Sequence, residues 1–126
     1  MLTAFMCSVV LSPVAHAEWT KVIKNEIGDN FYVNFERIKK HSDKVYYWEL
    51  IGFSKPSELG VRSNRSYIEA ECDRLRVRYL NSTFFNGPMA SGTMIAEINT
   101  PEKNWRYVPP DSVDDFILKA VCNHKP

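Results

Sequence analysis

Short runs of β-branched and aromatic residues, separated by turn-forming clusters, recur through most of this 126-residue chain. Runs of this kind are typical of β-strands in an antiparallel meander. The clearest turns are Gly28-Asp29-Asn30 and Asn86-Gly87-Pro88. We therefore expect about six main strands and a short final one. The expected strands cover residues 19–24, 31–35, 44–53, 64–72, 75–84, 91–98 and 105–108.

The last element has a different pattern, which is that of an amphipathic helix over residues 111–122. Ser112 and Asp115 stand at the spacing of a capping box, with Asp in place of the usual Glu. The apolar positions that follow at helical spacing are Val113, Phe116, Ile117, Ala120 and Val121. The sequence thus predicts an α+β fold, in which an antiparallel sheet of about six strands carries a C-terminal helix packed on one face.

The first 17 residues have the composition of a secretory signal peptide. They contain no Asp, Glu, Lys or Arg, include an apolar run over residues 2–11, and end in Ala15-His16-Ala17. The apolar run is too short to span a bilayer. The alternative is a buried N-terminal helix, which Pro13 and the abrupt change of composition at Glu18 disfavour. We therefore expect a signal peptide at residues 1–17 and a single domain at residues 18–126.

Composition limits the partners that this domain can have. The formal net charge of the chain is +1 and none of the charged residues lies in the predicted signal. A near-neutral exported domain is not expected to bind nucleic acid, whose binding domains are usually strongly basic. It also has no polybasic run for adsorption to a membrane. After cleavage no integral membrane segment is expected.

Cleavage would leave two cysteines, Cys72 and Cys122, which have one possible pairing in an oxidising compartment. On the helical pattern above, Cys122 lies nearly opposite the centre of the apolar stripe. The helix must therefore unwind before Cys122, or the disulfide must be made from its flank. Cys7 would leave with the signal, and because bulky Met6 precedes it we expect no lipid anchor. The predicted location is periplasmic, secreted or cell-surface.

The stretch "YIEAECDRLRVRYL" changes phase in its middle. Up to Cys72 the small apolar positions fall on even-numbered residues, whereas from Leu75 onward they fall on odd-numbered ones. A continuous strand cannot change phase in this way, so a turn or bulge must lie at Asp73-Arg74. We expect a short hairpin with Cys72 at its tip, facing the core.

After this turn, Arg74, Arg76 and Arg78 share one face of the predicted strand. One interpretation is the solvated side of a half-buried strand. The other is a surface that binds carboxylates, sulfates or phosphates of an acidic partner. The neighbouring pair Glu69 and Glu71 has the pattern of ordinary surface charge.

The strand "KVYYWELIGF" is apolar on both of its faces. Such a strand either is central and covered on both sides, or exposes one aromatic face to a partner. We expect burial, because the C-terminal helix is available to cover one side.

Signals for catalysis or metal binding are weak. Outside the predicted signal the histidines are His41 and His124, both in polar surroundings, and no Cys-x-x-Cys or His-x-x-x-His spacing occurs. There is no phosphate-binding glycine loop and no nucleophile elbow. We therefore expect no catalytic residue, no metal site, no cofactor and no enzymatic activity.

The segments "WTKV", "FYVNFERIKK", "KVYYWELIGFSKP", "YIEAECDRLRVRYL", "PMASGTMIAEI", "WRYVPPDS" and "KAVC" together resemble the surface-adhesin protein E family of bacterial exported domains. The resemblance implies an antiparallel sheet of about six strands flanked by a C-terminal helix. It also implies a homodimer, which the residues themselves do not indicate. A family member anchored at the cell surface binds host extracellular-matrix and serum proteins. The absence of a lipid-attachment motif here is a departure from that pattern.

The predicted function is that of an exported, non-enzymatic binding module, adhesin-like, which recognises a protein or an acidic polymer of the host matrix or the cell envelope. The alternative is a periplasmic inhibitor or accessory subunit of a cell-envelope enzyme, because a rigid disulfide-bonded domain can present a loop at little ordering cost.

Overall fold

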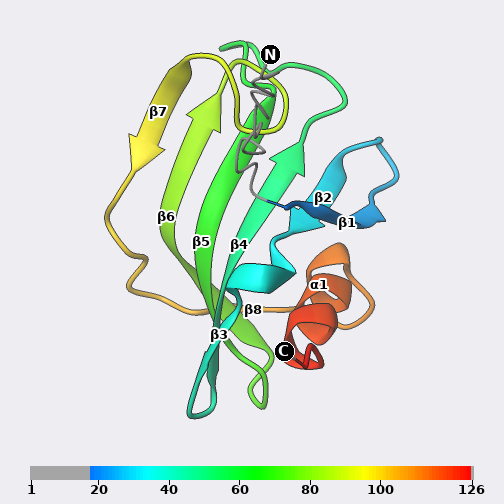
Figure 1. Ribbon diagram of the computed structural model, residues 1–126, viewed down its shortest axis with the longest axis vertical. Coiled ribbons are helices and arrows are strands. Elements are labelled where there is room, and N and C mark those ends of the chain that lie inside the picture. The colour runs from blue at the N-terminus through cyan, green and yellow to red at the C-terminus, as the bar shows by residue number, and fades with distance from the viewer. Residues whose placement is uncertain (1–17, 126) are drawn as a thin grey trace, which may run out of the picture.

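The computed structural model describes residues 18–125, which form one antiparallel sheet and one α-helix, as Figure 1 shows. The strands are β1 (Thr20–Lys24), β2 (Asn30–Val33), β3 (Lys39–His41), β4 (Lys44–Gly52), β5 (Ser63–Glu71), β6 (Arg76–Phe85), β7 (Met94–Ile98) and β8 (Arg106–Tyr107). A 3-10 helix, η1 (Phe35–Arg37), joins β2 to β3, and the α-helix α1 (Val113–Cys122) comes last. The predicted signal peptide lies outside the described residues.

The sheet is a meander in the order β1-β2-β4-β5-β6-β7, which confirms the predicted fold class. Two short strands extend it, since β3 pairs with β4 and β8 pairs with β6. Strand β3 is not among the strands expected from the sequence. All three of its residues, Lys39, Lys40 and His41, are exposed, so it has no apolar alternation that could have indicated a strand.

Strand β4 lies inside the sheet, between β2 and β3 on one edge and β5 on the other. Its odd-numbered side chains, including Val45 and Tyr47, point to the side that α1 covers, here called the helix side, where they join the buried core. On the opposite side, here called the outer side, Tyr46 and Trp48 are only half-buried. The expected burial is therefore correct for the helix side and incomplete for the outer side.

The phase change in "YIEAECDRLRVRYL" is a β-hairpin between β5 and β6. The chain turns over residues 72–75, and Leu75 adopts a positive φ of 50°. Glu71 then pairs with Arg76, Ala70 with Val77 and Glu69 with Arg78. The predicted turn at Asp73-Arg74 is confirmed, with Cys72 as its first residue.

Helix α1 begins as predicted, because the Ser112 side chain accepts a hydrogen bond from the Asp115 backbone N–H. Its buried face differs from the prediction. Ile117, Leu118 and Val121 are buried, whereas Phe116 is 53% exposed. The true stripe is thus rotated towards Leu118, which lies one turn before Cys122 and brings that cysteine to the flank of the stripe.

A disulfide joins Cys72 at the hairpin turn to Cys122, the last residue of α1, with the two Cα atoms 6.0 Å apart. The predicted pairing is confirmed. The disulfide is made from the flank of the apolar stripe, because α1 does not unwind before Cys122. Lys40 of β3 also connects the end of the helix to the sheet. Its Nζ donates hydrogen bonds to the backbone oxygens of Cys122 at 3.2 Å and His124 at 2.6 Å. The end of the helix is therefore fixed to the sheet at two points.

Removing the disulfide in a C72A/C122A variant is expected to lower the free energy of unfolding. The bond spans 50 residues, for which the loss of chain entropy in the unfolded state predicts about 4 kcal/mol. Urea unfolding of the variant against the oxidised wild type measures the difference. Reduced wild type is the matched control, and a variant as stable as the oxidised protein would contradict the prediction.

The corrected helix stripe is tested by two truncations on the same helix. Leu118→Ala removes a side chain that is 1% exposed and should cost about 2–5 kcal/mol. Phe116→Ala removes a larger side chain from an exposed position and should change stability by less than about 1 kcal/mol. Equal losses in thermal unfolding would restore the original assignment of the buried face.

Candidate functional site

The outer side of the hairpin carries ion pairs that the cross-strand register dictates. Arg76 Nη2 lies 2.7 Å from Glu71 Oε1, and Arg78 Nε lies 2.6 Å from Glu69 Oε1. Both carboxylates are buried, with residue exposures of 5% each. The interpretation of Glu69 and Glu71 as surface charge is therefore wrong, because the two arginines lie across them.

Trp105, the residue before β8, completes this surface. Because β8 pairs with β6 so that Tyr107 stands opposite Arg76, the neighbouring odd-numbered Trp105 falls on the same side as the arginines. The guanidinium carbons of Arg76 and Arg78 lie 4.5 and 4.6 Å from the centroid of the indole ring, and Lys44 Nζ lies 5.8 Å from it. Cation–π attraction therefore holds three cations around one half-buried tryptophan. We call Lys44, Arg74, Arg76, Arg78 and Trp105 the cationic cluster.

The three predicted arginines differ in how exposed their side chains are. Arg74 lies in the turn with its side chain 67% exposed, and its Nε is 3.5 Å from Glu71 Oε2. The side chains of Arg76 and Arg78 are 15% and 28% exposed and are fixed by their ion pairs. The structure thus brings the three together on the outer side, with Arg74 the most accessible.

Glu69 is held in its charged form. Burial opposes ionisation, but hydrogen bonds from Tyr46 Oη at 2.7 Å and from Arg78 Nε outweigh it, so the pKa of Glu69 is lowered. A carboxylate that stays ionised keeps Arg78 in place across the physiological pH range.

An aromatic strip continues from the cationic cluster along the outer side. The Tyr67 ring lies 6.2 Å from the Tyr46 ring and 4.7 Å from the Trp48 ring, between centroids. Arg65 lies over Trp48 at 5.6 Å and over Phe85 at 5.3 Å. Half-buried aromatic residues and arginines are the residue types that dominate binding energy at protein interfaces.

Trp105 and the aromatic partners of Arg65 are not indicated by any pattern in the sequence. Trp105 stands 27 residues beyond Arg78 in the chain, so no local spacing connects them. The ion pairs could have been predicted from the hairpin. Residues at equal distances from its turn face each other across the two strands, which places Glu69 and Glu71 opposite arginines.

The two histidines within residues 18–125 lie in different surroundings. His124 lies against Phe35 with the ring centroids 5.1 Å apart, and His41 is exposed in β3. Within residues 18–125, no group of three or more His, Cys, Asp or Glu side chains is placed to hold a metal ion. No helix in that part of the chain is long and apolar enough to cross a membrane.

On the helix side, Glu49 projects towards the core from the middle of β4. It is 3% exposed, and burial, with a smaller contribution from the charge of Asp114, raises its pKa from 4.5 to about 8. At neutral pH this side chain is therefore mostly protonated.

A family model and solved structures both relate this chain to the same group of proteins. The family model described as surface-adhesin protein E matches residues 19–123. The structure resembles crystal form II of Haemophilus influenzae protein E, with a TM-score of 0.67 and 16% identity over 85% of this chain and 88% of that one. It also resembles protein E from non-typeable Haemophilus influenzae, with a TM-score of 0.63 and 18% identity over 89% and 81%. Among curated proteins none matches significantly.

Glu49 makes stability depend on pH in a direction opposite to that of an ordinary salt-bridged carboxylate. Between pH about 4.5 and about 8 the folded chain holds a proton that the unfolded chain releases. Rising pH therefore favours unfolding in this window, by at most about 1.4 kcal/mol per pH unit. Glu49→Gln, which cannot ionise, should remove this loss.

Urea unfolding of wild type and Glu49→Gln at pH 5, 6, 7 and 8 tests the prediction. The variant should gain stability relative to wild type at each step. Glu69→Gln is the control, since the pKa of Glu69 is lowered and its ionisation favours folding. Parallel profiles for wild type and Glu49→Gln would show that Glu49 ionises normally.

Proposed function

This chain belongs to the surface-adhesin protein E family, and we propose that it is an exported, non-enzymatic, adhesin-like module that binds an acidic partner through the cationic cluster. The observation that carries this proposal is the arrangement of Lys44, Arg76 and Arg78 around the half-buried ring of Trp105. Beyond family membership, this proposal names the binding surface, which is the cationic cluster, and the chemical class of the ligand, which is acidic.

The cationic cluster can bind a further anion in addition to the two glutamates with which it forms ion pairs. The contact of Arg78 with Glu69 uses Nε, and a guanidinium has five N–H donors in all. Arg74 is largely exposed beside them, and the four cations of the cluster outnumber the two carboxylates that they face. A carboxylate, sulfate or phosphate group can therefore be bound without breaking the internal pairs.

The cluster is also ordered before it meets a ligand. Arg76 and Arg78 are held between buried carboxylates and the indole ring, so little side-chain entropy is lost on binding. A sheet surface of this kind suits a repetitive acidic polymer or an acidic face of a protein, with the adjacent aromatic strip providing apolar contact.

The test uses heparin as an acidic polymer and uncharged dextran as its control, with the protein purified from the exported fraction. A K44Q/R74Q variant removes two charges without placing a new carboxylate beside Glu71. It should weaken heparin binding roughly threefold to tenfold, because exposed charge pairs contribute a few tenths to one kcal/mol each. The wild-type affinity should fall as salt rises.

A K21Q/K24Q variant is the matched control, because it removes the same charge from exposed positions on β1, at the other edge of the sheet. It should bind heparin nearly as wild type does. Equal losses in the two variants would show that only net charge matters, and the proposal would then be rejected for this surface.

A further inference from the structure

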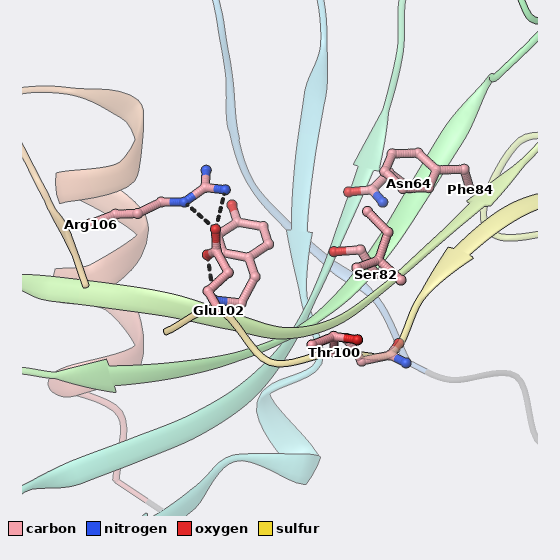
Figure 2. Close-up of a pocket in the computed structure, with 9 residues that line it drawn as sticks. Asn64, Ser82, Phe84, Thr100, Glu102 and Arg106 are labelled. Carbon is pink, nitrogen blue, oxygen red and sulfur yellow. Dashed lines mark hydrogen bonds and ion pairs between the residues drawn. The ribbon is translucent and has the colours of Figure 1, made fainter. Parts of the chain in front are cut away.

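The helix side of the sheet contains a pocket that is separate from the cationic cluster. Its volume is about 210 Å³, and it lies between β5, β6 and the segment that links β7 to β8. Figure 2 shows Arg106 and Glu102 on one wall, and Asn64, Ser82 and Phe84 on the opposite wall. Ligand pockets for drug-sized molecules measure roughly 300–1,000 Å³, so this one has the size for a single small ring.

The first wall is fixed by Glu102. Its backbone N–H donates to the Tyr79 backbone oxygen at 2.9 Å, and its Oε1 accepts from the Tyr79 backbone N–H at 2.8 Å. Its Oε2 accepts from Arg106 Nε at 3.0 Å and Nη2 at 2.6 Å. The Arg106 guanidinium also lies 4.6 Å from the centroid of the Tyr79 ring. The linking segment and Arg106 are thus held against β6.

The second wall carries a chain of buried polar groups. Ser82 Oγ lies 2.8 Å from Ser66 Oγ, which donates to Asn64 Oδ1 at 3.2 Å. Asn64 Nδ2 donates to the Thr83 backbone oxygen at 3.2 Å. All three residues are less than 10% exposed. Their orientation is therefore set before any ligand enters.

Hydrogen-bonding capacity remains on both walls. Asn64 Nδ2 has two N–H groups and uses one of them for Thr83, and a serine hydroxyl has two acceptor positions. Arg106 contacts Glu102 through Nε and Nη2, and Figure 2 shows its third nitrogen turned away from that carboxylate. Phe84 and Ile98 also line the pocket and give it apolar surface beside these polar groups.

The charge balance disfavours an ionic ligand. Glu102 neutralises Arg106 directly, and the pKa of Glu102 is lowered, so the pair stays ionised. Asp114 adds a negative charge near Tyr79, whose pKa is raised mainly by burial. A ligand with hydroxyl groups around its edge and one apolar face matches this surface better than an anion does.

We propose that this pocket binds one neutral sugar ring, with its hydroxyls on Asn64, Ser82 and Arg106 and its apolar face on Phe84. The ligand class is a hexopyranose, free or as one unit of a glycan. The site does not depend on the cationic cluster, so the two proposals can fail separately.

The test titrates the protein, purified from the exported fraction, with glucose, galactose and N-acetylglucosamine, and with glucuronate as the anionic counterpart. Backbone amide NMR should show shifts around Thr100, Glu102 and Arg106 for at least one neutral sugar. The Kd should be about 1–10 mM, as expected for so small a ligand.

Two variants locate the site. Thr100→Trp, at an exposed position on the rim, should fill the pocket and abolish these shifts, whereas Thr20→Trp on β1 is the matched control and should preserve them. Ser82→Ala should weaken binding about five- to tenfold through the loss of one buried hydroxyl. If Ser82→Ala does not fold, the tryptophan pair decides alone.

The proposal is overturned if no neutral sugar causes shifts at roughly tenfold above the expected Kd range, if glucuronate binds more tightly than the neutral sugars, or if Thr100→Trp binds as wild type does. Heparin binding by Thr100→Trp should be unchanged, which separates this pocket from the cationic cluster.

Discussion

The β5–β6 hairpin is the element on which the rest of this structure depends, because its turn sets the register of both strands and holds Cys72. With the turn at residues 72–75, Glu71 faces Arg76 and Glu69 faces Arg78 on the outer side, while Ala70 faces Val77 on the helix side. A slip of one residue would place the charged pairs in the core and the apolar pair in solvent. The disulfide to Cys122 then fixes α1 to this same turn.

The outer surface follows from that register. Buried carboxylates are unfavourable unless they are paired, and here each one has an arginine directly across the ladder. The arginines in turn lie on Trp105, which the short strand β8 brings to the edge of β6. The cationic cluster is therefore a consequence of how the hairpin satisfies its own carboxylates, and its cations are oriented by the fold.

Much of this architecture could be predicted from local patterns. The strand runs, the Ser112 cap and the phase change after Cys72 each depend on residues close together in the chain, and the structure confirms them. Apart from the missed strand β3, the errors concern contacts between distant segments. The buried stripe of α1 is centred near Leu118, and not near Phe116, because the disulfide and the sheet decide which way the helix turns. The local pattern assigns Glu69 and Glu71 to the surface, because their burial depends on arginines of β6 and on Trp105, the residue before β8.

A single sheet can carry two chemically different surfaces because alternate side chains of each strand point to opposite sides. On β5, Arg65, Tyr67 and Glu69 face outward, where cations and aromatic rings gather, whereas Asn64 and Ser66 face the helix side. The helix covers only part of that side, so the polar chain of Asn64, Ser66 and Ser82 borders a pocket. The same alternation makes the surfaces independent, since a substitution on one leaves the side chains of the other in place. The two proposed ligands, an acidic polymer and a neutral sugar, would in this way bind to separate surfaces of one domain of about 100 residues.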